Sequence, residues 1–268
     1  MAIPRFYIPD LCPGDSPLPE DQDHHARHVL RLRHGEEIIA FNGRGLWGRG
    51  TLVLERRESL FRLSGSLVQD IASSQTITAA CAVPKADRAM TLVEQLSQIG
   101  VARLVWLHCR HSVVHPDAGG GKMLKFRRVA VESARQCQRN FVMDITAPVR
   151  LPDFLGNPGA GVTDMLWTDP DAGESLFDFV NKYKNSYMPN SSGKTDHPVQ
   201  DAQTTAGPAI LIGPEGGWSE EETVLLAAHP HVHAVRLTDT ILRMETAAVV
   251  AAAILHCGLQ GNETTDPK

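Results

Sequence analysis

The 268-residue sequence has few cysteines and no long apolar run. Its five cysteines stand apart, without a Cys-x-x-Cys pair, so neither a zinc ribbon nor a disulfide framework is expected and a reducing compartment is favoured. No apolar stretch reaches the roughly 18 residues of a membrane span. The opening MAIPRFYIPD lacks the charged and then apolar pattern of a signal peptide. These absences predict a soluble, cytoplasmic protein without a membrane-bound part.

Lysine is absent from residues 1–72, which carry nine arginines and ten acidic residues. The net charge of the chain is −5, yet residues 85–150 hold eleven basic and five acidic residues, whereas residues 151–268 hold six and sixteen. One basic third gives the chain a local electrostatic footprint for nucleic acid that the total charge hides. Arginine suits bidentate contacts with phosphate, although an arginine-rich source proteome explains the lysine-free section equally well.

No metal site is predicted, although the chain has twelve histidines. Two groups have spacings that could suit a metal: His24, His25 and His28, and His229, His231 and His233. The first group stands at an expected helix start without a third type of ligand nearby, so a structural or RNA-contacting role is favoured. The second group flanks a proline turn, where exposure to solvent explains it.

The pattern of apolar residues predicts an α/β fold with an N-terminal β domain. Short alternating stretches separated by turn residues indicate a small antiparallel β domain over residues 1–72: 37–41, 48–54 and 60–67. Over residues 73–268, strands and helices alternate, which is typical of a mostly parallel sheet. The strands are expected at 76–83, 103–108 and 163–168, and the helices at 87–99 and 122–139. Residues 181–208 are polar and without periodicity, so a long surface loop is expected.

A glycine-rich loop is the most informative motif, within the sequence ILIGPEGGWSEEE of residues 210–222. An apolar run predicts a strand before it, and Ser219 with Glu222 forms a capping box that predicts a helix after it. This order presents bare backbone amides to a ligand. The loop has no lysine and is therefore not a P-loop, and its glutamates would repel a phosphate, so a neutral or cationic ligand is favoured. A tight, well-capped turn without a ligand is the alternative.

A second motif, LTDTILRMETA, occupies residues 237–247. A strand is expected before it at 234–237, and after it a helix at 246–257, which is apolar all round and therefore buried. Arg243 and Glu245 stand at the mouth of this helix, where charged groups rarely lie without a partner or a task.

Together these two motifs resemble the C-terminal signatures of the SPOUT methyltransferases, and most of all the RsmE family, which methylates N3 of a uridine in small-subunit ribosomal RNA. Similar to that family too are residues 3–7 and the segments HHARHVLRL (24–32), KADR (85–88) and RQCQRN (135–140). The similarity spans about residues 3–256. Met244 stands where family members usually have threonine, and His28 where they often have arginine.

The resemblance implies a SPOUT catalytic domain with a deep trefoil knot at 73–268 and a PUA-like RNA-binding barrel at 1–72. It also implies S-adenosylmethionine as cofactor, 16S ribosomal RNA within the small subunit as substrate, and a homodimer with the site near its interface. The cofactor is expected between the two loops and the end of the strand at 163–168. Its candidate contacts are Thr168, Leu211, Ile212, Gly213, Glu215, Gly217, Leu237, Ile241, Leu242 and Met244.

Methylation of uracil N3 requires loss of its proton, so the enzyme must favour the anion. A cation aimed at the base oxygens would do this electrostatically. Arg243 and Arg139 are the candidates, and Glu245 either orients Arg243 through a bidentate pair or serves as a helix N-terminal carboxylate. The sequence singles out no general base. Because N3 pairs in a duplex, the target must be unpaired or flipped out.

Arginines of the first domain and of the basic third are the candidates for RNA contact: Arg5, Arg27, Arg31, Arg110, Arg128 and Arg135. On the helix at 122–139 an apolar stripe opposes a basic face that includes Arg128 and Arg135. That basic face is either turned to RNA or simply solvated.

Two other functions remain open at this point. Glycine loops after strands also serve nucleotide-cofactor oxidoreductases, but the chain lacks a GxGxxG with an acidic residue about 20 positions further on. A non-catalytic RNA-binding protein is the other, and the departure at Met244 is its only hint.

Overall fold

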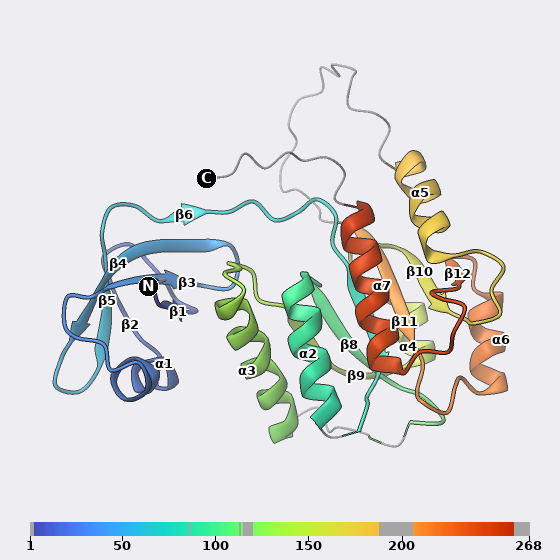
Figure 1. The fold of residues 1–268 in the computed structure, drawn as a ribbon, viewed down its shortest axis with the longest axis horizontal. Helices are drawn as coiled ribbons and strands as arrows, with labels where there is room; N and C mark the ends of the chain where they lie inside the picture. The colour runs from blue at the N-terminus through green and yellow to red at the C-terminus, as the bar shows by residue number, and fades with distance from the viewer. Residues whose placement is uncertain (1–2, 86, 113, 115–119, 188–205, 260–268) are drawn as a thin grey trace, which may run out of the picture. The chain divides into compact units, whose positions relative to one another are not determined.

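The computed structural model describes residues 3–85, 87–112, 114, 120–187 and 206–259. The chain, coloured from blue at the N-terminus to red at the C-terminus in Figure 1, forms two compact units. Each unit is described by itself. Unit 1 comprises Met1–Ala72 and Ala130–Val142, and unit 2 comprises Ser73–Val129 and Met143–Lys268. The expected boundary at 72/73 placed residues 130–142 in the catalytic domain. In the structure, the contacts of this segment group it with the N-terminal unit.

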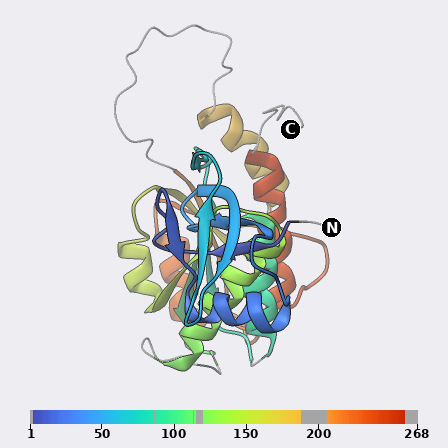
Figure 2. The same cartoon turned by 90° about the vertical axis from the view of Figure 1, so that its left-hand side faces the viewer.

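Unit 1 is built around a six-stranded sheet. Its strands run in the order β1 (Arg5–Tyr7), β3 (Glu37–Phe41), β4 (Leu46–Leu54), β5 (Ser59–Leu63) and β2 (Asp15–Pro17), and β6 (Val68–Gln69) pairs with β4. Every pair is antiparallel except β1 with β3. Helix α1 (Glu20–His24) continues into a π-helical turn, η1 (His25–Val29), seen in blue at the lower end of the strands in Figure 2.

The alternating stretches expected at 37–41, 48–54 and 60–67 correspond to β3, β4 and β5. Each forms a strand because alternation turns one apolar face toward the core. Phe6, Ile38, Leu52 and Phe61 are completely buried in the core of this unit. The stretch expected at 60–67 ends at Leu63, and the short strand β6 follows separately.

Unit 2 contains a second six-stranded sheet, in which every neighbouring pair is parallel. Its order is β12 (Val232–Val235), β10 (Val162–Thr168), β11 (Gly207–Ile212), β7 (Thr78–Ala82), β8 (Arg103–His108) and β9 (Asp144–Arg150). The predicted α/β class and the parallel sheet are confirmed. Strand β9 and the helix α4 (Leu151–Gly156) after it were not predicted.

Besides α4, the described helices of unit 2 are α2 (Asp87–Ile99), α5 (Leu176–Tyr187), α6 (Glu220–Ala228), α7 (Met244–Leu259) and part of α3 (Gly121–Gln136). Helix α7 packs against α2 and α5 and on strands β11 and β7; it and α2 lie in front of the sheet in Figure 1. Its alanine-rich sequence permits this close packing. The prediction of a helix buried all round is confirmed on one face only, because the residues outside the buried set are half-buried or exposed; the buried set is Met244, Ala247, Ala248, Ala251, Ala252, Leu255 and Leu259.

The sheet order fixes where a ligand can bind. Strand β11 enters late in the chain, between β7 and β10. Since all these strands are parallel, their carboxyl ends meet at one edge of the sheet. In open α/β sheets, ligands bind outside the carboxyl ends where the direction of the strand order changes. The glycine-rich loop after β11 and the loop after β12 that contains Arg243 both start at this edge.

The surface loop expected in the later part of the chain needs correction at both of its ends. The surface loop expected at 181–208 is helix as far as Tyr187 and strand from Gly207; residues 188–205 lie outside the described range. Helix α5 was missed although its buried residues Leu176, Val180 and Tyr183 follow the i, i+4, i+7 spacing of an amphipathic helix. In the part of the chain that is described, no helix has the length and apolar character to cross a membrane.

Candidate functional site

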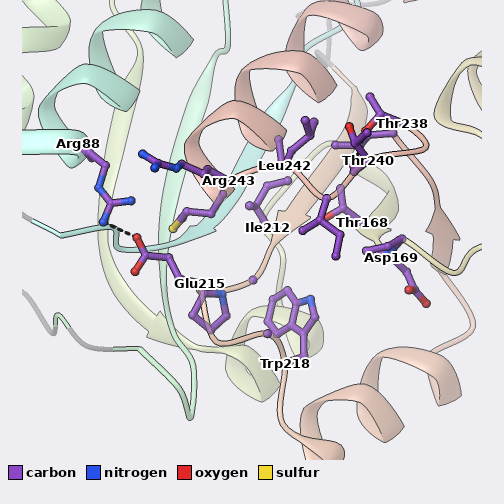
Figure 3. Close-up of a pocket in the computed structure, with 18 residues that line it drawn as sticks. Arg88, Thr168, Asp169, Ile212, Glu215, Trp218, Thr238, Thr240, Leu242 and Arg243 are labelled. Atoms are coloured by element: carbon purple, nitrogen blue, oxygen red, sulfur yellow. Dashed lines mark hydrogen bonds and ion pairs between the residues drawn. The ribbon is translucent and has the colours of Figure 1, made fainter.

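A pocket of about 680 Å³ lies at the carboxyl ends of β10 and β11, within unit 2. Both predicted loops and the residues after β10 line it, together with one residue of α2 (Figure 3). The lining consists of Arg88, Thr168, Asp169, Pro170, Ile212, Gly213, Pro214, Glu215, Gly217, Trp218, Leu237, Thr238, Thr240, Ile241, Leu242, Arg243, Met244 and Ala247.

Steric limits shape the glycine-rich loop. A Cβ on Gly213 would come within 2.8 Å of two atoms of the Trp218 indole, so only glycine fits beneath the ring. Gly217 is glycine for a different reason, since its φ of +75° lies in the left-handed region and its Cβ position is open. Gly213 is thus required by the Trp218 ring and Gly217 by its backbone angle, and the close approach of both to a cofactor stays a prediction.

The other side of this loop is held by His111, which follows β8. Its Nδ1 lies 3.1 Å from the carbonyl oxygen of Gly217. A carbonyl only accepts, so the ring carries its proton on Nδ1 and donates it to the loop. The amide of Gly217 in turn donates to the carbonyl of Pro214, which closes the turn at 2.9 Å.

The helix after the loop begins as the capping box predicted. The Ser219 hydroxyl accepts the amide of Glu222 at 3.2 Å, and the Glu222 carboxylate accepts the amide of Ser219 at 2.8 Å. The second oxygen of Glu222 accepts the Arg110 amide at 2.8 Å, so this buried carboxylate also fixes the end of β8. Both oxygens of Glu222 thus accept backbone amides, and Glu222 does not line the pocket.

The end of β10 supplies the third wall, as expected. The Thr168 hydroxyl donates to the carbonyl of Leu211 at 3.3 Å and so ties β10 to β11. Leu211, which was expected to contact the cofactor, is not among the residues that line the pocket. Leu211 is completely buried in the sheet, because its place in the strand alternation turns it away from the pocket that Ile212 reaches.

The second loop, Leu237–Arg243, closes the opposite side. The Thr238 hydroxyl donates to the carbonyl of Thr240 at 2.7 Å and stabilises the turn. Ile241 lines the pocket but is 87% exposed, whereas Met244 is buried at the start of α7. Met244, the departure from the family pattern, therefore contributes an apolar surface at the bottom of the site.

The charged groups of the pocket are arranged differently from the prediction. Two roles were open for Glu245: it lies in the first turn of α7, which fits a helix N-terminal carboxylate, and its carboxylate lies 3.4 Å from the guanidinium of Arg88 rather than paired with Arg243. Arg88 also reaches Glu215 at 2.5 Å (Figure 3). Among the described residues, Arg243 has neither an ion pair nor a side-chain hydrogen bond, and its exposed side chain extends toward the Arg88–Glu215 pair.

Most of the expected cofactor contacts are thus brought together, since all but Leu211 line one pocket. Arg88, Trp218, Thr238 and Thr240 were missed. The first stands 157 positions from its partner Glu245, and no local pattern links the two. The other three lie inside the quoted motifs, and their roles depend on loop conformation.

Arg139 does not line the pocket and belongs to unit 1. Burial lowers the pKa of its guanidinium. In the same unit, Asn140 accepts a hydrogen bond from Arg5 and donates to Asp70 at 2.7 Å, and its carbonyl accepts the Gly45 amide. The end of the RQCQRN segment (135–140) is therefore held by contacts within unit 1.

The RNA-binding candidates divide into two sets. Arg5 stacks on the Phe41 ring, Arg27 bonds Asp23 and two backbone carbonyls, and Arg135 pairs with Glu132 at 2.5 Å. The side chains of these three arginines are already engaged in contacts within the protein. The remaining three are exposed and have no ion pair in the described part of the chain: Arg31, Arg110 and Arg128.

The histidine groups show no metal-binding arrangement. No cluster of three or more potential ligands occurs among the described residues. His24 and His28 lie ring to ring at 4.8 Å on successive helical turns. His233, which was expected to be simply solvated, instead bonds the nearly buried carboxylate of Asp164 at 3.1 Å.

Comparison with known proteins decides the family. The RNA methyltransferase domain matches residues 72–256, and the RNA methyltransferase PUA domain matches residues 18–61. The chain belongs to the RNA methyltransferase family. It is thus an enzyme of RNA modification, and its first unit contains a PUA domain.

Relatives of this RNA methyltransferase include two proteins named ribosomal RNA small subunit methyltransferase E. The Rickettsia conorii protein is 25% identical over 260 residues, which cover 94% of this chain and 95% of the relative. The Mycobacterium bovis protein is 28% identical over 268 residues, which cover 94% and 90%. The resemblance to the RsmE family drawn from the motifs is confirmed.

Solved structures share the fold of this RNA methyltransferase. One from Legionella pneumophila, described as a methyltransferase with bound S-adenosylmethionine, is 25% identical and has a TM-score of 0.76 over 96% of this chain and 98% of that chain. A ribosomal RNA small subunit methyltransferase E from Neisseria gonorrhoeae is 22% identical and reaches the same TM-score over the same shares.

Proposed function

We propose that this RNA methyltransferase transfers a methyl group from S-adenosylmethionine to N3 of a uridine in 16S ribosomal RNA. The observation that carries the proposal is the pocket at the ends of β10 and β11, which combines an apolar wall, a glycine loop and one guanidinium without an ion pair among the described residues. The relatives that are named for methylation of small-subunit ribosomal RNA support the substrate class.

The residues present fit this cofactor. Ile212, Leu237 and Leu242 offer apolar surface for an adenine, and the glycine loop leaves its backbone accessible. The acidic side chains of Glu215 and Asp169 line the pocket, which disfavours a polyphosphate and tolerates a cationic sulfonium. S-adenosylmethionine supplies an electrophilic methyl group on that sulfonium, and a Legionella pneumophila structure of this fold is described with it bound.

The protein's own contribution is to make uracil N3 nucleophilic. We assign Arg243 to this task, because its guanidinium lines the pocket while Glu245, its expected partner, contacts Arg88 instead. A preorganised cation beside the base stabilises the negative charge that develops on the uracil oxygens as the N3 proton leaves. Arg139 remains a second candidate from the family motif. No general base is assigned.

RNA recognition is proposed for the PUA-containing unit and the exposed arginines of the basic third. The target uridine must be unpaired or flipped out, since N3 takes part in Watson–Crick pairing. The resemblance to the RsmE family further supports a trefoil knot, a homodimer with the site near its interface, an assembled small subunit as the substrate context, and a cytoplasmic location.

Two measurements test the function. Calorimetric titration with S-adenosylmethionine and, separately, with NADH distinguishes the methyltransferase from a nucleotide-cofactor oxidoreductase. Mass-spectrometric mapping of methylated uridines in ribosomal RNA then compares a strain that lacks the protein with strains complemented by the wild type and by Arg243→Ala. We expect one N3-methyluridine to disappear and to return only with the wild type. An unchanged nucleoside map together with RNA binding would instead support a non-catalytic protein.

A further inference from the structure

Two carboxylates from two different loops meet one guanidinium at the pocket. Arg88 places Nη2 at 2.5 Å from Oε1 of Glu215 and Nη1 at 3.4 Å from Oε1 of Glu245. Both nitrogens at the end of one planar group are thus engaged, each by a different partner. A guanidinium suits this geometry because its donors are held in a rigid fork.

The three residues come from separate elements. Glu215 belongs to the glycine loop after β11, and Glu245 is the second residue of α7, directly after the second pocket loop. Arg88 stands in the first turn of α2, which packs against α7. One side chain of a helix outside both loops therefore connects the ends of the two loops that enclose the pocket.

Partial burial makes this contact more costly to break than an ordinary surface salt bridge. The side chains of Arg88 and Glu215 are each 35% exposed, and that of Glu245 is 15% exposed. The second oxygen of Glu245 is buried and has no hydrogen-bond partner among the described residues. Removing the guanidinium would leave a mostly buried carboxylate unpaired, and such a change costs much more than breaking a solvated pair.

We propose that Arg88 is a positioning residue that holds the two loops at the separation required for the cofactor. The inference rests on the proposed function, since it concerns S-adenosylmethionine as the occupant of the pocket. Without Arg88 the carboxylates of Glu215 and Glu245 repel each other and both loops lose a common anchor. The pocket then opens, and cofactor affinity falls.

This role predicts a particular pattern of ligand affinity. The adenosine part, which the loops enclose, is shared by S-adenosylmethionine and its product S-adenosylhomocysteine, whereas only the first carries a positive sulfonium. A loop anchor therefore affects both ligands equally. A direct electrostatic effect of the charge of Arg88 on the sulfonium would change their ratio instead.

The experiment is calorimetric titration of the full chain with each ligand, together with steady-state methylation of ribosomal RNA. The variants are Arg88→Met, Arg88→Lys, Glu215→Gln and the double variant Arg88→Met/Glu215→Gln. Arg150→Met is the matched control, since it breaks another arginine–carboxylate pair of unit 2, with Asp153 at 2.7 Å, outside the pocket lining. Thermal unfolding is recorded for every variant.

We expect Arg88→Met to weaken both ligands by about tenfold, which corresponds to one partly buried contact. The KM for S-adenosylmethionine should rise while kcat stays within about threefold of the wild type. Arg88→Lys should recover part of the affinity because an ammonium can satisfy one carboxylate at a time. The double variant should lose less than the two single losses combined, and Arg150→Met should bind as the wild type does.

Several results would overturn the proposal: a lowered Tm with unchanged affinities, a loss confined to one of the two ligands, or additive losses in the double variant. If Arg88→Met does not fold, Arg88→Lys and Glu215→Gln still decide between these outcomes. Failure of the wild type itself to bind S-adenosylmethionine would instead refute the proposed function, so the two failures are distinguishable.

Discussion

The indole of Trp218 occupies the space that a side chain at Gly213 would need. A Cβ at residue 213 would stand 2.8 Å from both Cε2 and Nε1 of that ring, which is closer than a side-chain carbon can approach. Both residues line the pocket, Gly213 at the end of β11 and Trp218 just before α6. The ring thus covers the point where the strand changes into the loop, and the glycine permits it to do so.

Gly213→Ala should therefore displace the Trp218 ring and lower cofactor affinity by at least about tenfold. Calorimetry with S-adenosylmethionine measures this loss. Gly156→Ala is the control, since nothing lies within 4 Å of its Cβ position. In the double variant Gly213→Ala/Trp218→Ala the clash is absent, so the loss should equal that of Trp218→Ala alone. A further loss in the double variant would show that the clash is not the cause.

Gly217 should respond to substitution through its backbone alone. Its φ of +75° strains any L residue, although its Cβ position is open. Gly217→Ala should destabilise the protein by about 1–2 kcal/mol, and Gly217→Asn by less, because asparagine tolerates the left-handed region. Thermal denaturation checks this order. Equal stability of the alanine and asparagine variants would indicate a different role for this glycine.

The fold of unit 2 was largely predictable because its signals are local. Runs such as 209–212 and 104–107 are apolar throughout, as strands buried on both faces are, and Ser219 with Glu222 marks a helix start by direct hydrogen bonds. Strand β9 was missed because its sequence, DITAPVR, contains a proline and is only partly apolar. Edge strands tolerate such residues, and β9 is an edge of the sheet.

The site was predictable in its loops and not in its long-range contacts. The glycines and the apolar residues of the two motifs signal a ligand-binding loop by their own conformational and packing needs. The partner of Glu245, by contrast, depends on how α2 packs against α7, and sequence spacing favoured Arg243 only because it is two residues away. Leu211 was assigned to the pocket, although only its neighbour Ile212 lines it. Because the run 209–212 is apolar throughout, the sequence does not show which of its side chains face the pocket.

RNA binding should depend on exposed arginines rather than on those already paired. Arg128→Glu places a charge reversal on an exposed position of α3, whereas Arg135→Glu breaks the pair with Glu132 at 2.5 Å. Arg128→Glu should weaken RNA binding. It should also make the dependence of log affinity on log salt less steep, by the amount expected for the loss of about one to two phosphate contacts. Arg135→Glu should mainly lower Tm. Filter binding of ribosomal RNA across a salt series measures both, and binding that does not vary with salt would exclude this account.

Stability should fall at alkaline pH because two thiols are buried. Burial raises the pKa of Cys109 to about 12 and that of Cys81 higher still, from an ordinary value of 9.0. Above about pH 9 the thiols ionise in the unfolded chain but stay protonated in the folded protein. The free energy of unfolding should then decrease by about 1.4 kcal/mol per pH unit for each thiol up to their folded pKa values. Cys109→Ala should remove about half of this slope in denaturant titrations between pH 9 and 11.

Arg243 provides the sharpest test of the mechanism. Its expected structural partner Glu245 is bound by Arg88, so a purely structural role for Arg243 has no partner among the described residues to act through. If its guanidinium stabilises charge on the uracil, Arg243→Ala should lower the single-turnover methylation rate by about 10²–10³ at saturating cofactor and RNA. Cofactor affinity and Tm should change little. Arg243→Lys should be nearly as damaging, because an ammonium does not present the planar fork to the base oxygens.

The opposite result is equally specific. If Arg243 only anchors the second loop, Arg243→Ala should weaken S-adenosylmethionine binding and lower Tm, and the single-turnover rate at saturation should match the wild type. The same measurement on Arg88→Lys is the internal comparison, since that residue is proposed to act on affinity alone. A rate loss for Arg243→Ala without a loss of affinity, next to an affinity loss for Arg88→Lys without a loss of rate, would separate the chemical role from the positioning role within one pocket.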